Sequence, residues 1–194
     1  MNRESLLKTN KKGFTLVELL VAIAIIGVLA TLSTVSVISA RIKTREAIAL
    51  NDIAQILKAI EMLENDTGFL PGHQPINIVC TDIVGGCPAE NEICGPDKDG
   101  AVCASGLRDG SSGIVIDDTV LSFPGWAGSY MNKIPLDPWG HEYFFDTDYL
   151  VTIDNEPCDG AAVCLSAIVI GSYGPNGNGK NLYDSDDIIR VLLR

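Results

Sequence analysis

The sequence predicts an α+β fold in which a long N-terminal helix packs on a small antiparallel β-sheet. A helical pattern runs from about Thr15 to Asn65 without a proline, and short apolar runs separated by turn residues follow from Met131 onward. The apolar residues are also unevenly spread, because the stretch from Phe14 to Ala40 holds a single charge. A chain of 194 residues is long enough for one domain and an additional element of this kind.

The apolar stretch, residues 14–40, has the length of a transmembrane helix. It exceeds the roughly 20 apolar residues that cross a bilayer core. Such a surface would not stay soluble in water, so it must lie in lipid or pack against copies of itself. Residues 1–13 form a separate polar leader, and no small-residue cleavage site of an ordinary secretory signal clearly follows the apolar run.

Residues 41–66 are expected to continue the same helix as an amphipathic half. Apolar side chains recur there at spacings of three, four and seven residues, which places them on one face. They are Ile42, Ala49, Ile53, Ile56, Ile60 and Leu63. The opposite face carries Thr44, Asn51, Gln55 and Lys58. The whole helix would be about 75 Å long, so we expect one half in the membrane and the other on a folded domain.

The helix is expected to end at Asn65–Gly68, with Pro71 beyond it, and two regions follow. Residues 67–130 are rich in glycine, serine and cysteine, and we interpret them as a cysteine-rich loop insertion with one short strand at Gly113–Asp117. Residues 131–194 are expected to form the sheet. The predicted strands are Tyr143–Phe145, Leu150–Ile153, Leu165–Ile170, which suits a central position, and Ile188–Leu193.

Charge is strongly polarised along the chain. Residues 1–13 carry a net charge of +3, and the rest of the chain carries −14. Positive charge before an apolar span holds that end in the cytoplasm, which predicts a single-pass protein with its acidic domain across the membrane. A domain this acidic would repel phosphate groups, so nucleic acid is not expected as a partner.

All six cysteines follow the apolar span, and an exported location favours disulfides over free thiols or metal ligands. Cys158 and Cys164 enclose five residues and are suited to staple a hairpin. The other four would form two bridges inside the insertion, by any of three pairings. They are Cys80, Cys87, Cys94 and Cys103. The chain has no Cys-x-x-Cys pair, which argues against zinc.

The sequence KKGFTLVELL, from Lys11 to Leu20, resembles the class III signal of type IV pilins and type II secretion pseudopilins. The basic residues, the Gly–Phe junction and the glutamate at the fifth position after the junction all fit that signal. The resemblance implies that prepilin peptidase cuts between Gly13 and Phe14 and that the new Phe14 amine is methylated. It also implies an inner-membrane protein with a periplasmic C-terminal domain.

Glu18 is informative on physical grounds as well. A carboxylate inside an apolar span costs several kcal/mol unless it is paired, and intramembrane ionisable residues are functional by default. In a stack of helices, Glu18 of one subunit can pair with the Phe14 ammonium of its neighbour and set the register between subunits. The alternative is a glutamate at the headgroup region that serves only as a polar helix end.

Two further segments resemble the major pseudopilin of type II secretion. KIPLDPWGHEY, from Lys133 to Tyr143, is similar to its P-x-D-P-W-G-x-x-Y segment, and residues 171–177 with 184–188 are similar to its C-terminal loop. That loop binds calcium in the family, so the resemblance implies Ca²⁺ here. The oxygen ligands that Ca²⁺ prefers would come from Asn176, Asp184, Asp186 and Asp187. The alternative is a solvated turn.

Nothing in the sequence indicates an enzyme, because it shows no nucleophile–base constellation and no phosphate loop. The turn Asp137-Pro138-Trp139-Gly140 is interpreted as structural, with Trp139 packed on the helix. His73 and His141 are interpreted as ordinary surface residues.

The resemblance favours a structural subunit of the periplasmic pseudopilus of type II secretion. The implied partners are copies of the chain, other pilin-like subunits, prepilin peptidase and an inner-membrane assembly platform. The length of the insertion favours the alternative of a surface type IV pilin or minor pilin used for adhesion or filament capping. A third hypothesis is a membrane-anchored binding module, against which Glu18 argues.

Overall fold

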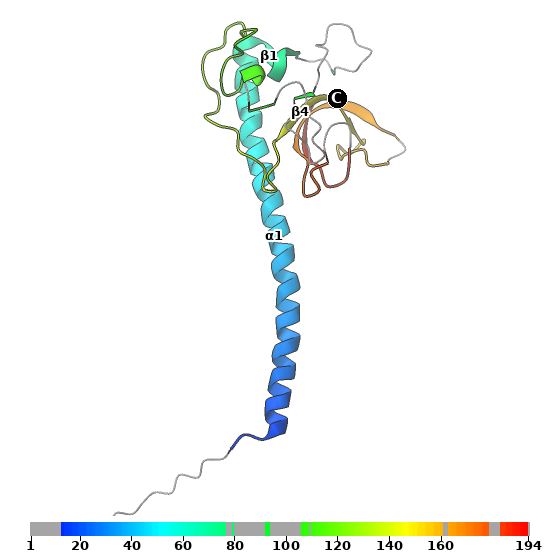
Figure 1. The fold of residues 1–194 in the computed structure, drawn as a ribbon. Helices are drawn as coiled ribbons and strands as arrows, with labels where there is room; N and C mark the ends of the chain where they lie inside the picture. Colours follow the sequence, from blue (N-terminus) through cyan, green and yellow to red (C-terminus); the bar gives the residue numbers. More distant parts are fainter. Residues whose placement is uncertain are drawn as a thin grey trace, which may run out of the picture. The chain divides into compact units, whose positions relative to one another are not determined.

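The computed structural model describes residues 13–76, 79, 92–93, 106–108, 110–160, 163–178 and 183–193, without the side chains of residues 33–35 and of Glu92. The chain consists of two compact units, residues 1–43 and residues 44–194. The fold is α+β, as the sequence predicted, with one long helix and small antiparallel sheets (Figure 1).

Helix α1 extends from Leu16 to Thr67 and contributes to both units. It ends where Gly68 adopts a φ of 75°, a left-handed conformation that glycine tolerates because it has no Cβ. The Gly68 N–H donates to the Glu64 carbonyl at 2.8 Å, and the Thr67 hydroxyl donates to the Leu63 carbonyl at 2.7 Å. The predicted helix end is therefore confirmed.

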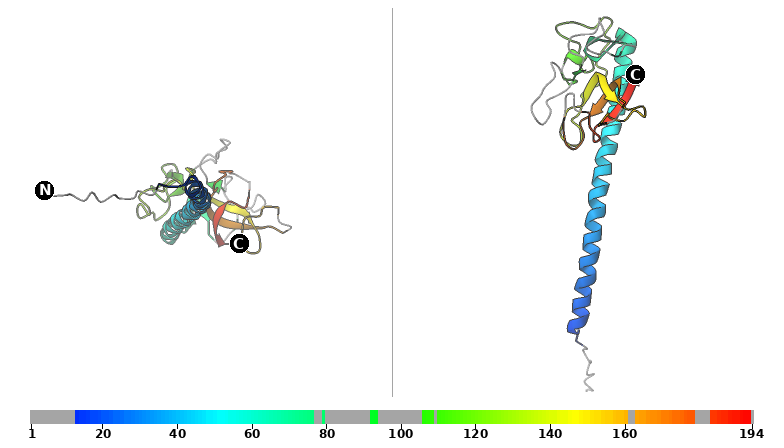
Figure 2. Two further views of the ribbon diagram at one scale, coloured as in Figure 1. Left: turned by 90° about the horizontal axis from the view of Figure 1, so that it is seen from below. Right: turned by 90° about the vertical axis from the view of Figure 1, so that its right-hand side faces the viewer.

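The main sheet has four antiparallel strands in the order β3-β4-β5-β6, and the last three appear in yellow, orange and red in Figure 2. Their bounds are Glu92–Ile93, Phe144–Val151, Leu165–Ser172 and Ile188–Leu193. A second sheet pairs β1 with β2 around the short helix η1, and helix η2 lies between β3 and β4 in the chain. Strand β1 is Phe69–Leu70, η1 is Pro71–His73, β2 is Gln74–Pro75 and η2 is Gly110–Ser112.

The predictions for β5 and β6 are confirmed, and β5 is central as expected. The two strands predicted at 143–145 and 150–153 are instead one strand, β4. A register shift between Asp146 and Tyr149 interrupts the pairing of β4 with β5. Phe145 belongs to one core cluster and Tyr149 to the other. A bulge of this kind moves side chains to the opposite face, so the alternation in the sequence breaks and resembles a turn.

The boundary predicted near residue 130 is wrong for the core, because residues of the insertion belong to it. Strand β3 comes from within residues 67–130 and pairs with β4. Leu107, Ile114 and Phe123 of the same region are almost completely buried. No strand forms at Gly113–Asp117, where the chain bends instead. These apolar residues have no regular spacing, so periodicity did not reveal them.

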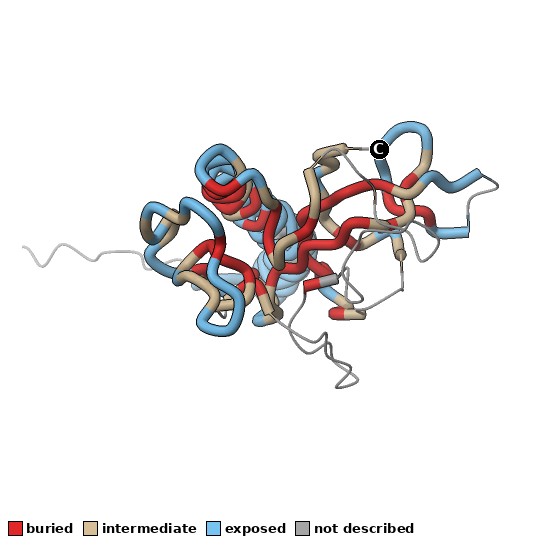
Figure 3. Tube along the Cα trace, turned by 90° about the horizontal axis from the view of Figure 1, so that it is seen from above, coloured by how far each residue is buried: buried red, intermediate tan, exposed pale blue. Residues whose placement is uncertain are grey.

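The C-terminal part of α1 packs on one face of the main sheet (Figure 3). Ile53, Ile56, Ile60 and Leu63 are fully buried there, in one cluster with Phe145 and Ile170. The hydroxyl of Tyr143 donates to the Asp52 carboxylate at 3.0 Å, which adds a polar link to α1. The opposite face of the sheet holds a second cluster that includes Phe144, Tyr149 and Val169. The predicted apolar face of α1 is confirmed from Ala49 onward, but Ile42 is exposed.

Candidate functional site

The start of α1 carries the residues predicted for processing and assembly. Gly13 and Phe14 precede the helix, and the Phe14 side chain is 86 % exposed. Thr15 and Glu18 form a capping box. The Thr15 N–H and hydroxyl donate to Glu18 Oε2 at 2.8 and 2.7 Å, and the Glu18 N–H donates to Thr15 Oγ1 at 3.3 Å. Sequence reasoning missed this role, although the Thr-x-x-Glu spacing is its usual signature.

The first part of α1 presents apolar side chains in every direction. From Gly13 to Ile48, every residue with a described burial is exposed. Among the described residues, α1 is the helix long and apolar enough to cross a membrane, with a mean hydropathy of 2.5 over its most apolar window. This segment is consistent with a membrane anchor.

Three of the four predicted metal ligands come together in the loop between β5 and β6. The Asn176 amide group donates to Asp184 Oδ2 at 2.8 Å and to Asp186 Oδ1 at 2.5 Å. Asn178 also donates to Asp184 Oδ2, at 3.3 Å. The fold requires Gly174 at this point, because a Cβ on it would lie 2.0 Å from the Asp186 carbonyl oxygen. The loop thus holds two carboxylates on either side of one amide.

The pKa values of the two carboxyl groups are shifted in opposite directions. Burial raises the pKa of Asp186, and the neighbouring Asp184 raises it further. Burial also opposes ionisation of Asp184, but hydrogen bonds donated by Asn176, Asp186 and Asn178 outweigh burial and lower its pKa. The close pair therefore favours one negative charge over two, and an added cation would relieve their repulsion.

The fourth predicted ligand, Asp187, turns its side chain into the protein core. It is 7 % exposed, and its Oδ2 accepts a short hydrogen bond from the Tyr149 hydroxyl. Burial raises its pKa to about 8, although the Tyr149 hydrogen bond opposes this. The Asp187 side chain therefore does not lie with the oxygen donors of the loop.

The Asp-Pro-Trp-Gly turn is built around Asp137, whose side chain is completely buried. Its Oδ1 accepts from the Trp139 and His141 N–H groups at 2.9 and 2.8 Å. Its Oδ2 accepts from the Ser172 hydroxyl at 2.6 Å. His141 lies against Gly177, where a Cβ would come within 2.5 Å of the ring. The turn thus supports the Asn/Asp loop, which agrees with the structural interpretation.

The histidines are not ordinary surface residues. His73 has a φ of 60°, its ring stacks on Phe123 at a centroid distance of 3.7 Å, and its Nε2 is buried without a hydrogen-bond partner among the described residues. His141 Nδ1 is buried and lies 3.6 Å from Asp137 Oδ2. Both contribute to packing, which single isolated residues in a sequence do not indicate.

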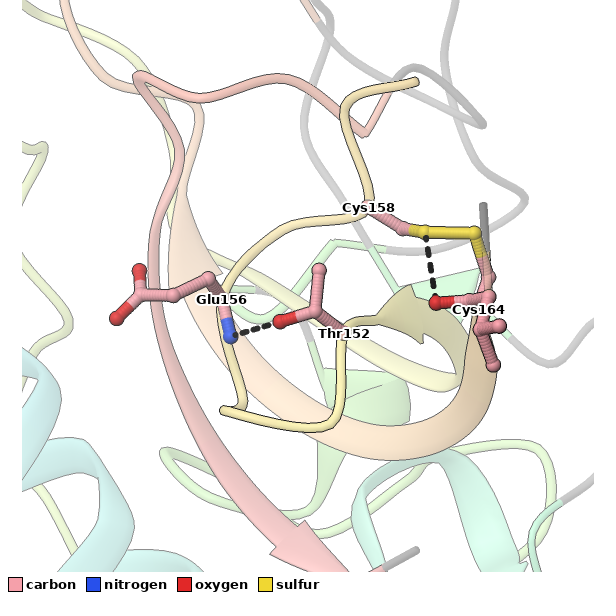
Figure 4. Close-up of a disulfide and its surroundings, with 5 residues drawn as sticks. Thr152, Glu156, Cys158 and Cys164 are labelled. Carbon is pink, nitrogen blue, oxygen red and sulfur yellow. Dashed lines mark hydrogen bonds between the residues drawn. A yellow bond between two sulfur atoms is a disulfide. The ribbon is translucent and has the colours of Figure 1, made fainter. Parts of the chain in front are cut away.

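The predicted Cys158–Cys164 disulfide is present and joins the two arms of the β4–β5 connection (Figure 4). The other four cysteines, Cys80, Cys87, Cys94 and Cys103, lie outside the described residues, so their pairing stays a prediction.

The fold and the N-terminal segment together define a pilin-like protein with a hydrophobic N-terminal helix. Residues 8–34 match the family model described as the prokaryotic N-terminal methylation motif. The chain is also similar to "Type II secretion system core protein G" of Pseudomonas aeruginosa. The two are 26 % identical over 175 residues, which cover 90 % of this chain and 92 % of the relative.

These findings support the assignment of the chain to the type IV pilin and type II secretion pseudopilin family, as the sequence motifs predicted. They also imply a structural rather than an enzymatic role.

Proposed function

We propose that the chain is a structural subunit of the periplasmic pseudopilus of type II secretion. It is anchored in the inner membrane by α1, and prepilin peptidase cleaves it between Gly13 and Phe14 and methylates Phe14. It then assembles with copies of itself and other pilin-like subunits on a membrane platform. The observation that carries this proposal is the exposed apolar half of α1, which contains Glu18 as its one charge.

This exposed apolar surface is costly in water. Burying apolar surface stabilises by about 25 cal/mol per Å², so residues 14–40 favour lipid while the subunit is a monomer. In a bundle of such helices the same surface packs against neighbouring copies. A chain can therefore move from membrane to filament without exposing the helix to water.

Glu18 has the geometry to take part in both states. Thr15 occupies Oε2, while Oε1 accepts no hydrogen bond from another described residue. A carboxylate accepts several hydrogen bonds, so Oε1 remains open to the ammonium that cleavage creates on Phe14 of a neighbouring copy. The alternative is that Glu18 only caps its own helix.

A pair of substitutions separates these roles. Glu18→Gln removes the charge, whereas Thr15→Ala removes the capping hydroxyl and keeps the charge. When the protein is produced together with a type II secretion machinery, we expect Glu18→Gln to abolish filaments seen by electron microscopy and Thr15→Ala to retain them. Loss of filaments with Thr15→Ala and normal filaments with Glu18→Gln would show that capping alone matters, because glutamine can keep the cap, and this result would refute the register role. Mass spectrometry of the wild-type chain tests for N-methylated Phe14.

We also propose that the loop of Asn176, Asp184 and Asp186 binds Ca²⁺. Two carboxylates and nearby amide oxygens are the hard oxygen donors that this ion prefers. The described residues contain no cluster of three or more His, Cys, Asp or Glu side chains suited to a metal, so amide and main-chain oxygens would have to complete the coordination. A bound Ca²⁺ would neutralise the pair and hold the β5–β6 loop closed.

One observation favours the alternative of a surface type IV pilin or minor pilin. The loop of residues 117–123 is ordered by Asp117 and Asp118, yet it presents Val120 at 93 % exposure and Leu121 at 61 %. An ordered apolar tip of this kind suits contact with another surface. Imaging the filaments at the cell surface, rather than in the periplasm, would favour this alternative.

A further inference from the structure

A groove of about 490 Å³ opens in the unit of residues 44–194, beside the last strand of the main sheet. Glu46 and Leu50 of α1 contribute to one part of its lining, and the turn of residues 154–156 contributes to another. The remainder consists of residues 187–191, from the residue before β6 to Val191.

The rim of this groove is acidic. Glu46, Asp154 and Glu156 are exposed, and none of them forms an ion pair with another residue in the described part of the chain. Arg190 is the one basic residue of the lining. Below the rim, Asp187 is buried, and its Oδ1 has no hydrogen-bond partner among the described residues. The groove therefore favours a cationic occupant.

The turn that carries the acidic rim has a fixed conformation. The Glu156 N–H donates to Thr152 Oγ1 at 3.3 Å, and the Thr152 N–H donates to the Glu156 carbonyl at 2.8 Å. The disulfide of Cys158 with Cys164 follows directly. Figure 4 shows the Glu156 side chain pointing away from this disulfide. A charge presented from an ordered turn loses little entropy when it binds.

The groove also exposes surface that a partner can cover. Strand β6 pairs with β5 along one edge, and its other edge has no strand partner among the described residues. Leu50 is 39 % exposed at the same place. Unpaired strand edges and apolar side chains next to charges are typical of interaction surfaces.

The chain itself carries the complementary charge. Arg41, Lys43 and Arg45 place three basic residues within five positions of α1. All three are exposed, and none forms an ion pair with another described residue. The four basic residues of the leader would be removed by cleavage, so this is the densest basic segment of the processed chain.

We propose that the acidic groove of one subunit receives the Arg41–Arg45 segment of a second copy. This inference rests on the proposed function, because it needs copies with nearly parallel helices. The centre of the basic segment lies about five residues before the centre of Glu46 and Leu50, which is about 7.5 Å along a helix. A second copy displaced by this distance brings its bases beside the acidic rim. The two charge groups therefore define an axial offset between subunits, in addition to any set by Glu18.

A charge-swap experiment in the full chain, produced with the secretion machinery, tests this contact. We expect Glu156→Lys and Arg45→Glu each to reduce the number of filaments about tenfold, because each brings like charges together. The double variant restores an attractive pair, so we expect it to recover filaments to within about threefold of wild type. Asp159→Lys and Lys58→Glu change exposed charges outside both surfaces and should have no effect. Thermal unfolding verifies that each variant is folded.

The other outcomes identify what failed. If the wild-type chain forms no filaments, the proposed function is wrong. If it forms filaments and Glu156→Lys assembles normally, the groove does not receive a basic segment. If Arg45→Glu lowers assembly and the double variant does not recover it, the bases bind another partner, such as anionic lipid headgroups, and the proposed contact is also wrong.

Discussion

The two halves of α1 belong to one continuous helix and yet bury their side chains in opposite ways. From Leu16 to Ile48, every residue with a described burial is exposed, and up to Ala40 the helix is apolar around its circumference except for Glu18. From Ala49 to Leu63, apolar residues on one face are fully buried while Asn51, Gln55 and Lys58 on the other face stay exposed. The described side chains of the first half are exposed, and the second half completes a core.

The difference shows where each half obtains its stability. The second half is stabilised by packing against its own sheet, which is the usual source of helix stability in folded proteins. Under the proposed function, the exposed apolar surface of the first half is stabilised by lipid or by other copies. Substitutions of the same kind should therefore have different consequences in the two halves.

The largest expected effect is on packing in the second half. Ile56→Ala removes a fully buried side chain and should lower the free energy of unfolding by about 2–5 kcal/mol. Ile25→Ala is the matched control in the first half, where the side chain is 54 % exposed. Its effect on the unfolding of the domain should be under about 0.5 kcal/mol. Thermal or denaturant unfolding of the purified chain in detergent measures both, and equal effects would contradict the comparison.

The second expected effect is on membrane insertion, and here a substitution in the first half should have the larger effect. Ile25→Asp introduces a charge near the middle of the apolar half and should cost about 3 kcal/mol of insertion free energy. Asn51→Asp places the same charge on the exposed face of the second half and should leave membrane association unchanged. Fractionation of membranes after alkaline extraction reports the result. Release of both variants, or of neither, would show that residues 14–40 are not the anchor.

A third, smaller effect concerns the β5–β6 loop of the packed domain. A ligand at a hundredfold excess over its dissociation constant stabilises the folded state by about 2.7 kcal/mol. If the loop binds Ca²⁺, a chelator should lower the melting temperature of the wild-type chain, and Asp186→Ala should abolish this shift. Asp159→Ala, which changes an exposed carboxylate elsewhere, should preserve it. A wild-type melting temperature that does not change when the chelator is added would refute the calcium proposal.

The smallest expected effect is a pH dependence in the loop of residues 117–123. Hydrogen bonds from the Ser122 hydroxyl and the Phe123 N–H lower the pKa of Asp117 below its ordinary value of 3.8. A carboxyl group with a lowered folded-state pKa stabilises the fold above its unfolded pKa, and this stabilisation is lost as the pH falls through the folded pKa.

The variant Asp117→Asn tests this sign. It should be less stable than wild type near neutral pH, and the gap should shrink as the pH falls below about 4. Melting temperatures at pH 7 and at pH 3 measure the gap. A gap that is constant over this range, as expected for the exposed control Asp159→Asn, would show that the Asp117 charge does not matter.

Much of the architecture followed from the sequence because it depends on local patterns. The helix, its end at Gly68, strands β5 and β6 and the Cys158–Cys164 pair were all predicted from periodicity, turn residues and spacing. The single strand β4 was not, because the bulge near Asp146 breaks the alternation on which strand prediction depends. The Thr-x-x-Glu spacing also indicates the capping role of Thr15, but Glu18 was interpreted only as a charge in an apolar span.

The candidate metal loop was likewise predicted only in part. The sequence placed Asn176, Asp184 and Asp186 in one loop, and the structure brings them together. The sequence could not show that Asp187, the residue after Asp186, faces Tyr149 in the core. Neighbouring residues that enter a strand point to opposite sides, and only the packing of the sheet decides which side is buried.

The sequence by itself determined the apolar segment of residues 14–40, the single charge at Glu18, the amphipathic half of α1 and the acidic character of the domain. Each of these depends on composition and on the 3.6-residue period of a helix, which need no knowledge of distant residues. Only the tertiary structure decided that Leu107, Ile114 and Phe123 complete the core, that Asp137 holds Ser172, and that Glu46 shares a groove with Glu156. These residues are far apart in the chain, and their proximity depends on how the chain folds.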